Sequence, residues 1–165
     1  MSTGCEDPEL EAAVPRLLRA ARAMGYPPEE AEDLVHDVLV DHLRARNAFR
    51  RECALYTWLY GILSRRHIDR LRRRTLKPPL PGPVPAAATA EADERARGVR
   101  EAVDALDEPY AAVLRLRFFG GLPYEEIARL LAAPAGTVKS QVFHGLQKLR
   151  SVLEKRFGVS LEEVL

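Results

Sequence analysis

Apolar residues recur every three or four positions along most of this chain, which is the spacing of one buried face of an α-helix. The spacing predicts a helix over 8–24, a break at the glycine and prolines of 25–28, and a long helix over 29–46. A further helical stripe runs from Leu59 to Leu71. The pattern therefore favours an all-α protein whose N-terminal part is a small helical domain.

Five prolines, at positions 78, 79, 81, 83 and 85, interrupt the helical pattern, and a polar run rich in alanine follows them. Proline removes a backbone donor and favours extended conformations, so this composition is typical of a semi-extended linker. We expect a linker over 78–98 that joins a helical domain over 1–77 to a second helical domain over 99–165. A chain of 165 residues is long enough for two such domains.

The second domain contains two predicted helices joined by a short turn. Ile127, Leu130 and Leu131 form an apolar stripe on the first helix. This helix ends before Pro134, because the residue preceding a proline is disfavoured in the α conformation. The next helix contains residues 137–150, and its apolar stripe consists of aliphatic side chains, Val138, Val142, Leu146, Leu149 and Leu153.

The opposite face of that last helix carries mostly hydrogen-bonding side chains, Lys139, Ser140, Phe143, His144, Gln147 and Lys148. Two helices joined by a short turn, the second apolar on one side and polar on the other, form a helix-turn-helix pattern. Such a face can place Lys, Ser and His against base edges and phosphates in a major groove. An ordinary helical hairpin with a solvated polar face has the same spacing, so the pattern alone leaves both interpretations open.

The net charge of +1 hides a strong segregation of charge along the chain. Residues 1–43 hold 3 Arg and 10 Asp or Glu, whereas residues 44–77 hold 11 Lys or Arg and 2 acidic residues. The last segment, 139–165, is basic again, with 5 Lys or Arg against 3 Glu. An acidic front and two basic blocks indicate two kinds of partner, with polyanions meeting the basic blocks.

Three carboxylates recur every four residues along the second predicted helix, at Asp33, Asp37 and Asp41. This acidic row has three interpretations. It can be a solvated face, its Asp37 and Asp41 can form a metal site together with His36 and His42, or it can dock a basic partner. No ligand elsewhere in the sequence points to the metal site.

Aromatic and basic residues alternate through residues 47–74. The aromatic residues are Phe49, Tyr56, Trp58 and Tyr60, and the arginines are Arg50, Arg51, Arg65, Arg66, Arg70, Arg72, Arg73 and Arg74. Arginine neutralises phosphates and aromatic rings stack on unpaired bases, so this block predicts contact with single-stranded nucleic acid. We expect Tyr56 and Tyr60 to be exposed and Trp58 to be packed inside.

Other features of the sequence exclude several classes of protein. We expect no signal peptide, and no apolar run approaches the roughly 20 residues of a membrane span. Cys5 and Cys53 do not make a disulfide framework, and each is better explained as a small apolar residue than as a redox sensor. We therefore expect a protein of the cytoplasm without membrane insertion.

Two blocks of the sequence, in this order, resemble the extracytoplasmic-function (ECF) sigma factors of bacterial RNA polymerase. AEDLVHDVLVDHL and FRRECALYTWLYGILSRRHIDRLRRR resemble sigma region 2. LDEPYAAVLRLRFFGGLPYEEIARLLAAPAGTVKSQVFHGLQKLR resembles sigma region 4 with its helix-turn-helix. Larger sigma factors carry additional regions before or between these two, which is why the resemblance is to the ECF group.

The resemblance implies a role for three sets of residues. The set that docks on the β′ clamp helices of core RNA polymerase is Asp33, Leu34, Val35, His36, Asp37, Val38 and Asp41. The set that recognises and opens the −10 element, holding a flipped base, is Phe49, Arg50, Arg51, Tyr56, Trp58, Tyr60, Arg65, Arg66, Arg70, Arg73 and Arg74. The set that reads the −35 element is Thr137, Lys139, Ser140, Phe143, His144 and Lys148.

The resemblance also implies the partners of the chain. These are core RNA polymerase, through its β′ clamp helices and its β flap, promoter DNA, and an anti-sigma factor. Catalysis belongs to the polymerase in this family, so we expect no enzymatic activity, no cofactor, no metal and no small-molecule substrate. Two rival functions from other classes are a stand-alone helix-turn-helix regulator and a metal-dependent nuclease.

The sequence departs from the family pattern at several of these positions. His36 stands where the family often has Gln, and Asp37 where it often has Glu. Pro123 replaces a frequent Ser, and Ala132-Ala133 replaces a common Leu-Gly before the turn. His144 stands where Arg is common, and imidazole cannot bind guanine bidentately as a guanidinium does, so the −35 preference is expected to differ.

Overall fold

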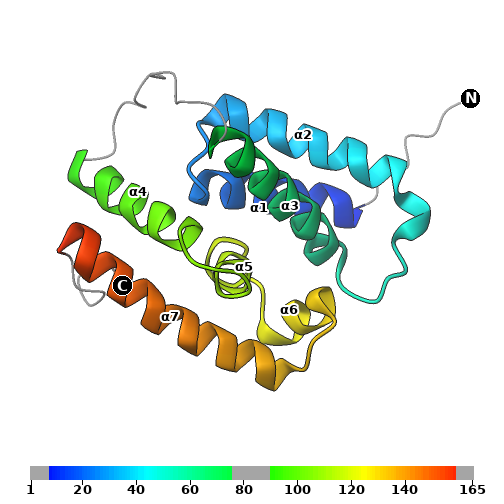
Figure 1. Cartoon of the computed structure of the whole chain (residues 1–165). Helices are drawn as coiled ribbons and strands as arrows, with labels where there is room; N and C mark the ends of the chain where they lie inside the picture. Colours follow the sequence, from blue (N-terminus) through cyan, green and yellow to red (C-terminus); the bar gives the residue numbers. More distant parts are fainter. Residues whose placement is uncertain (1–7, 76–89, 159–165) are drawn as a thin grey trace, which may run out of the picture. The chain divides into compact units, whose positions relative to one another are not determined.

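The computed structural model describes residues 8–75 and 90–158. These residues form two compact units (Figure 1), the first containing α1 to α3 and the second containing α4, α5, α7 and most of α6. The elements of the first unit are α1 (Pro8–Ala23), α2 (Pro28–Arg44), the 3₁₀ turn η1 (Arg46–Ala48) and α3 (Leu55–Thr75). Those of the second are α4 (Ala90–Asp104), α5 (Tyr110–Leu114), the π-helical segment η2 (Arg115–Phe119), α6 (Tyr124–Leu131) and α7 (Ala135–Phe157).

The all-α prediction is confirmed, since the described residues form helices and connections without a strand. In the first unit the three helices pack on one another in pairs, and Figure 1 shows them side by side. Their apolar stripes meet in a core in which Leu17, Leu34, Val38, Leu59 and Leu63 are fully buried. Burial of each such side chain contributes about 1.5–3 kcal/mol, so this core fixes the positions of α2 and α3 relative to each other.

The first two helices begin and end close to the predicted residues. Pro27 occupies the N-cap position of α2, and Pro28 lies in the first turn, where a missing N–H costs nothing. At the end of α1, Gly25 adopts a φ of 93°, and the N–H of Tyr26 reaches back to the carbonyl of Ala21 at 3.2 Å. This is the Schellman motif, in which a left-handed residue closes the helix.

In the second unit, α7 packs on both α5 and α4. The core between them includes Val113, Leu114 and Val138, which are at most 1% exposed. Gly145 allows α7 to approach α5 closely, because a Cβ at this position would lie 3.3 Å from two side-chain carbons of Leu114. The long last helix is therefore fixed by its apolar stripe, as the sequence pattern predicts.

The expected linker over 78–98 is wrong in its last part, because α4 begins at Ala90. Alanine is the best helix former, and Arg97 lies 3.8 Å from both Glu94 and Glu101, one turn away on either side. These local preferences make the alanine-rich run a helix. The five prolines of the expected linker fall within 76–89, outside the described residues.

The segment Arg115–Phe119 is a π-helix, a form that is rare and short in proteins. Its wider turn is seen in the hydrogen bond from the N–H of Gly120 to the carbonyl of Arg115, five residues earlier, at 3.0 Å. Arg115 is 2% exposed whereas Phe118 is 50% exposed. The segment thus ends the helix that α5 begins, before the chain turns into α6.

The turn between α6 and α7 is a second Schellman motif. The N–H of Ala133 donates to the carbonyl of Ala128 at 3.0 Å, and Ala132 adopts a φ of 50°. Gly25 fills the same left-handed position at the end of α1, but here the residue is alanine, whose Cβ makes this conformation costly. The departure of Ala132-Ala133 from the family pattern therefore leaves the turn intact and adds local strain.

Substituting Ala132 by Gly is expected to stabilise the second unit. Removal of Cβ relieves the left-handed strain, while the more flexible unfolded chain offsets part of the gain, so the free energy of unfolding should rise by about 0.5–1 kcal/mol. Urea denaturation followed by circular dichroism measures the change. The matched control is Ala133→Gly, one residue later and outside the positive-φ region, which should lower the stability. A loss of stability in Ala132→Gly would contradict the assigned motif.

Candidate nucleic-acid interface

The apolar face of α2 is buried against the other two helices of the first unit. Leu34 and Val38 are fully buried and Val35 is 3% exposed. These three side chains, which the resemblance assigns to docking, fill the core between α1, α2 and α3. They hold the outer face of the helix in place from beneath.

The outer face of α2 divides into a solvated part and a paired part. Asp33 and His36 are exposed, whereas Asp37 and Asp41 are partly buried. Arg66 of α3 donates from Nη1 to Asp37 at 3.0 Å and from Nε to Asp41 at 2.6 Å. The acidic row is therefore not simply solvated, since two of its three carboxylates have a cation of the same domain as a partner.

The pairing shifts the protonation equilibrium of both partners. The hydrogen bond from Arg66 is the largest cause that holds the pKa of Asp41 below its ordinary value of 3.8, and burial of the carboxyl acts in the opposite direction. The same hydrogen bond raises the pKa of Arg66. The pKa of Asp41 is lower in the folded than in the unfolded chain. The pair therefore stabilises the fold fully at pH values above the unfolded pKa, and this stabilisation is lost as the pH falls through the folded pKa.

We expect the wild-type chain to lose more stability on acidification than Asp41→Asn. The difference should develop below about pH 5 and stay under about 1 kcal/mol, because about a third of each side chain is exposed. Trp58, the one tryptophan of the chain, lies in the first unit, so its fluorescence during urea denaturation reports on this unit. Equal pH dependence of the two proteins would contradict the pairing.

Two tyrosines of α3 are buried, contrary to expectation. Tyr56 is 7% exposed and Tyr60 is fully buried, with ring centroids 6.0 Å apart. The guanidinium Cζ of Arg16, from α1, lies 3.6 Å from the centroid of the Tyr56 ring and covers it. Burial raises the pKa of Tyr56, although Arg16 and Arg19 act to lower it. These rings are therefore part of the domain's packing, and the expectation that Tyr56 and Tyr60 are exposed is wrong.

Phe49, Trp58 and His42 form an aromatic cluster under the connection between α2 and α3. The ring of Phe49 lies 5.6 Å from Trp58 and 6.3 Å from His42 between centroids. Phe49 and Trp58 are both half-buried, and His42 is buried. Trp58 is therefore less buried than the expectation that it packs inside, and Phe49 keeps part of its ring at the surface.

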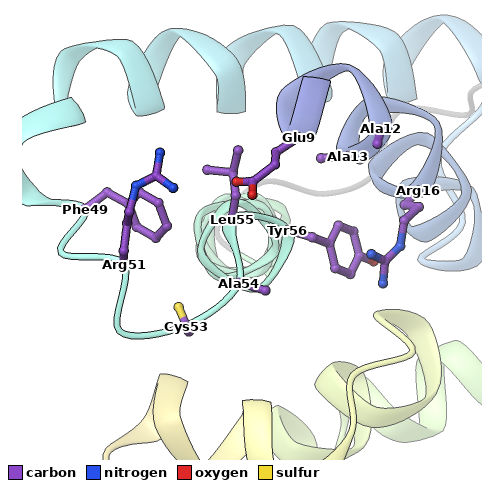
Figure 2. A pocket seen from close by; sticks show the side chains of 10 residues that line it. All are labelled: Glu9, Ala12, Ala13, Arg16, Phe49, Arg51, Cys53, Ala54, Leu55 and Tyr56. Atoms are coloured by element: carbon purple, nitrogen blue, oxygen red, sulfur yellow. The ribbon is translucent and has the colours of Figure 1, made fainter. Parts of the chain in front are cut away.

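A pocket of about 400 Å³ lies between the start of α1 and the loop that precedes α3 (Figure 2). Figure 2 shows its two arginines on opposite sides, with Arg16 beside Tyr56 and Arg51 on the side of Phe49. Arg51 adopts a φ of 57°, a strained conformation for a residue with a side chain. The pocket is lined by Glu9, Ala12, Ala13, Arg16, Phe49, Arg51, Cys53, Ala54, Leu55 and Tyr56.

A groove of about 800 Å³ runs between the second half of α2 and the middle of α3. Most of its lining side chains are charged, with arginines outnumbering carboxylates. Among the arginines assigned to DNA, Arg65 and Arg73 are exposed here, and the side chain of Arg74 lies outside what the structure describes. The groove is lined by Asp37, Asp41, Arg44, Ala45, Ala48, Trp58, Ile62, Arg65, Arg66, Asp69, Arg70 and Arg73.

The metal-site interpretation of the acidic row gains no support from the geometry. Asp37 and Asp41 face Arg66, and His42 is buried with its ring near Phe49. Within the described parts of the chain, no three His, Cys, Asp or Glu side chains are grouped so that they could hold a metal ion. Cys5 lies outside the described residues, and the half-buried Cys53 lines the pocket of Figure 2.

The polar face of α7 is exposed over its whole assigned length. Thr137, Lys139, Ser140, Phe143, His144 and Lys148 are all exposed, and 59% of Phe143 is accessible. On the other side Val138 is fully buried and Val142 is 3% exposed. The predicted division of this helix into a buried and an exposed face is confirmed. The positions of the six side chains fit a recognition helix whose outer face can enter a major groove.

Aromatic rings orient two of the lysines on this face. Nζ of Lys139 lies 5.7 Å from the ring centroid of Tyr124, and Cζ of Arg117 lies 4.8 Å from the same centroid. Nζ of Lys148 lies 5.2 Å from the ring of Tyr110. Exposed cation–π contacts contribute about 0.5–1 kcal/mol, enough to bias both ammonium groups without fixing them.

Comparison with known proteins matches both units to one family. The family model for sigma-70 region 2 covers residues 10–76, and that for sigma-70 region 4 covers residues 96–149. The RNA polymerase sigma-H factor of Pseudomonas aeruginosa is 30% identical over 143 residues, which cover 76% of this chain and 74% of that protein. The ECF RNA polymerase sigma factor SigM of Mycobacterium tuberculosis is 30% identical over 140 residues, covering 84% and 71%.

The chain belongs to the ECF group of the sigma-70 family. Members of this family are transcription initiation factors, and this ECF sigma factor directs promoter-specific initiation. The ECF sigma-E factor of Escherichia coli is 27% identical over 140 residues, which cover 74% of the chain and 73% of that protein. The resemblance seen in the sequence is confirmed.

Two solved structures share the fold of the sigma factor. One is the sigma factor RpoE in complex with the anti-sigma factor NepR from Bartonella quintana, with a TM-score of 0.58, 22% identity, and coverage of 89% of this chain and 95% of that one. The other is CnrH in complex with the cytosolic domain of CnrY, with a TM-score of 0.59, 20% identity, and coverage of 90% and 97%. Among the described residues of the sigma factor, every helix is too short or too polar to cross a membrane.

Sequence reasoning missed the contribution of α1 to the candidate site. Glu9 and Arg16 line the pocket of Figure 2 with residues some forty positions later in the sigma factor. Periodicity marks α1 as a helix with a buried stripe, but it carries no information about which loop the exposed face meets. The missing signal is the packing of α1 on α3, which only the folded chain provides.

Proposed function

We propose that the two units divide the work of promoter recognition. The first unit, within 1–77, docks on core RNA polymerase and opens the −10 element, and the second, which starts with α4, reads the −35 element. The observation that carries this proposal is the exposed face of α7, where Lys139, Ser140 and His144 lie opposite the buried Val138. A solvated hairpin has no need of an exposed Phe143 on the same face.

Docking is assigned to the outer face of α2, against the β′ clamp helices of the polymerase. Asp33 and His36 are its exposed members, and Asp37 and Asp41 flank them on the side of α3. Carboxylates on one helical face fit a basic partner surface, because complementary charge steers and orients a docking partner. The buried side chains of α2 then contribute only by positioning this face.

The pocket of Figure 2 is assigned to a flipped base of the −10 element. Its volume of about 400 Å³ suits a small planar ligand, and Arg16, Arg51 and Phe49 offer guanidinium planes and an aromatic ring for stacking. The face of Tyr56 is covered by Arg16, so a base would contact Arg16 in its place. Arg65 and Arg73 would meet the phosphates of the opened strand.

Regulation by an anti-sigma factor is proposed from the fold. One of the two solved structures described above contains a sigma factor in complex with an anti-sigma factor, and the other contains CnrH in complex with the cytosolic domain of CnrY. A partner of this kind would bind this chain as well and cover its DNA-contacting faces. The β flap of the polymerase is proposed as a second contact of the chain, and the cytoplasm as its location. Because the polymerase is the catalyst, the chain would need no cofactor and no enzymatic activity of its own.

In vitro transcription with purified core RNA polymerase tests the proposed function. A promoter library randomised in both elements should yield transcripts only when the sigma factor is added, with enriched −10 and −35 sequences. The free protein should bind these promoters weakly. Equal, tight promoter binding with and without core polymerase would favour a stand-alone helix-turn-helix regulator and contradict the proposal.

Substituting His144 by Arg is expected to shift the base preference at one or two −35 positions by about 1–3 kcal/mol, the size of one good base contact. His144 is exposed, with its ring edge against Phe143 at 5.5 Å between centroids, so the change should leave the fold intact. Transcription from the −35 library measures the shift. Lys148→Ala is the contrasting variant, and it should weaken all promoters together and reduce the salt slope by about one unit. Uniform scaling by His144→Arg would contradict the assigned recognition face.

A further inference from the structure

Four charged side chains form one ion-pair network between α2 and α3. Nε of Arg66 donates to Oδ2 of Asp41 at 2.6 Å, and its Nη1 donates to Oδ2 of Asp37 at 3.0 Å. Nη2 of Arg70 lies 3.9 Å from the same oxygen of Asp37. All four side chains line the groove between the two helices. The network therefore links the helix of the docking carboxylates to the helix of the DNA-facing arginines.

The proposed function gives these four side chains two different partners outside the protein. It assigns Asp37 and Asp41 to a basic surface of the polymerase, and Arg66 and Arg70 to DNA phosphates. Charged hydrogen-bonding groups that already satisfy one another bind an outside partner less well, because the existing bonds must first be broken. Each assigned contact therefore competes with the network.

Resting on that proposed function, we infer that Arg66 couples polymerase docking to DNA binding. In the free sigma factor, Asp37 and Asp41 hold Arg66 and Arg70 away from DNA. A basic docking surface that binds these carboxylates releases both arginines to phosphates. By thermodynamic linkage, DNA bound at the arginines must in turn make the carboxylates more available to the polymerase.

The exposure of the network allows such an exchange. The exposed fraction of the side chain is 32% for Arg66, 44% for Asp37 and about a third for Asp41 and Arg70, so outside charges can reach every member. Ion pairs at this exposure are individually weak, and a stronger partner can replace them without unfolding the domain. A buried network would lack this property, because breaking it leaves desolvated charges.

The charges around the network determine whether its opening strengthens or weakens DNA binding. Arg44, Arg65 and Arg73 lie in the same groove and are exposed. Released arginines would therefore extend a surface that is already positive. Asp69 is the third carboxylate of the groove.

The first test removes the counter-ions and measures binding of a polyanion by the free protein. The double variant Asp37→Asn/Asp41→Asn of the full chain is compared with wild type, using the fluorescence anisotropy of labelled oligo(dT). We expect its affinity at low salt to rise about five- to twenty-fold, and the salt slope to steepen by about one unit, because two more cations reach phosphates. Unchanged affinity in a variant with native Trp58 fluorescence would overturn the inference.

The matched control removes the same charge from the same helix without touching the network. Glu29→Gln/Glu32→Gln replaces two exposed carboxylates of α2, and its affinity for oligo(dT) should change less than about two-fold, since distant exposed charges are screened. An equal rise in both double variants would assign the effect to net charge and overturn the inference. In an Arg66→Gln background the gain from Asp37→Asn/Asp41→Asn should fall to the part that Arg70 contributes, and a gain of full size there would also overturn the inference.

The second test uses core polymerase without DNA, and it separates the coupling from the proposed docking face. Arg66→Gln should bind core about three-fold more tightly, because it removes a competitor for Asp37 and Asp41. Weaker binding would show that Arg66 orients the carboxylates and would overturn the inference. Unchanged core binding by both Arg66→Gln and Asp33→Arg would instead overturn the docking face itself, whatever the oligo(dT) result.

A measurement on the wild-type chain avoids substitutions altogether. The side-chain Nε–H of Arg66 donates to Asp41, and its NMR resonance reports on that bond. Saturation with oligo(dT) should shift this resonance, as the bond to Asp41 is replaced by one to phosphate. An unchanged resonance in the DNA-bound protein would overturn the inference.

Discussion

Asp33→Arg is expected to lower the affinity of the sigma factor for core RNA polymerase by about 30-fold or more. Asp33 is the exposed carboxylate of the proposed docking face. Its reversal places like charge against a basic partner, which costs several kcal/mol across a close interface. Labelled sigma factor titrated with core polymerase measures the change. Transcription should fall in parallel at limiting concentrations and recover when the variant is supplied in excess.

Asp33 is a better probe of docking than Asp37, because reversal at Asp37 would also set a new arginine against Arg66 and Arg70. The matched control is Glu32→Arg, an equal charge reversal at an exposed position of the same helix that has no assigned role. It should lower the affinity only a few-fold, through long-range charge alone. Comparable losses in the two variants, or none in Asp33→Arg with normal helicity, would remove Asp33 from the interface.

Arg115→Met is expected to destabilise the second unit by about 2–4 kcal/mol. The Arg115 side chain is 2% exposed, and it donates to Asp104 at 3.1 Å and to Glu108. Glu108 in turn accepts from the N–H of Ala112 at 2.9 Å, in the first turns of α5. One guanidinium thus ties α4, the connection after it and α5 together, and its loss leaves two carboxylates without their shared cation.

Two spectroscopic signals separate this effect from general unfolding. Trp58 fluorescence follows the first unit only, whereas circular dichroism follows the helices of both. The urea midpoint seen by circular dichroism should fall by more than about 1 M while the fluorescence midpoint stays in place. Arg117→Met is the control, since Arg117 is half-buried and donates to the carbonyl of Leu122, and its effect should stay below about 1 kcal/mol. Equal shifts in both signals would contradict the assignment.

The features that the sequence predicts well are those set by local spacing. The stripe of Val138 and Val142 lies opposite Lys139 and His144 whatever α7 packs against, because 3.6 residues complete one turn. The ends of α1 and α2 follow from Gly25 and from the prolines after it for the same reason. Local composition also explains why α4 begins at Ala90, inside the expected linker, because the alanines that follow the prolines favour a helix.

The features that the sequence does not predict depend on contacts between distant residues. Arg66 of α3 pairs with carboxylates of α2, and Arg16 of α1 covers Tyr56 of α3. A tyrosine between arginines looks like a stacking platform in sequence, yet its exposure depends on how α1 packs. The same limit applies to Val35, whose place in the family's docking helix does not reveal that its side chain is buried.

The π-helical segment has a consequence for how the length of the chain can vary. A π turn holds one residue more than an α turn at the same place in a helix. Deleting one residue between Arg115 and Phe119 could be absorbed by a return to α-helical pitch, with Leu122 and the helix-turn-helix keeping their register. A deletion in α6 before Ile127 would instead rotate the later residues of that helix by about 100° relative to the first turn and turn Ile127 out of the core. Natural length variants of this unit should therefore be tolerated at η2 before they are tolerated in α6.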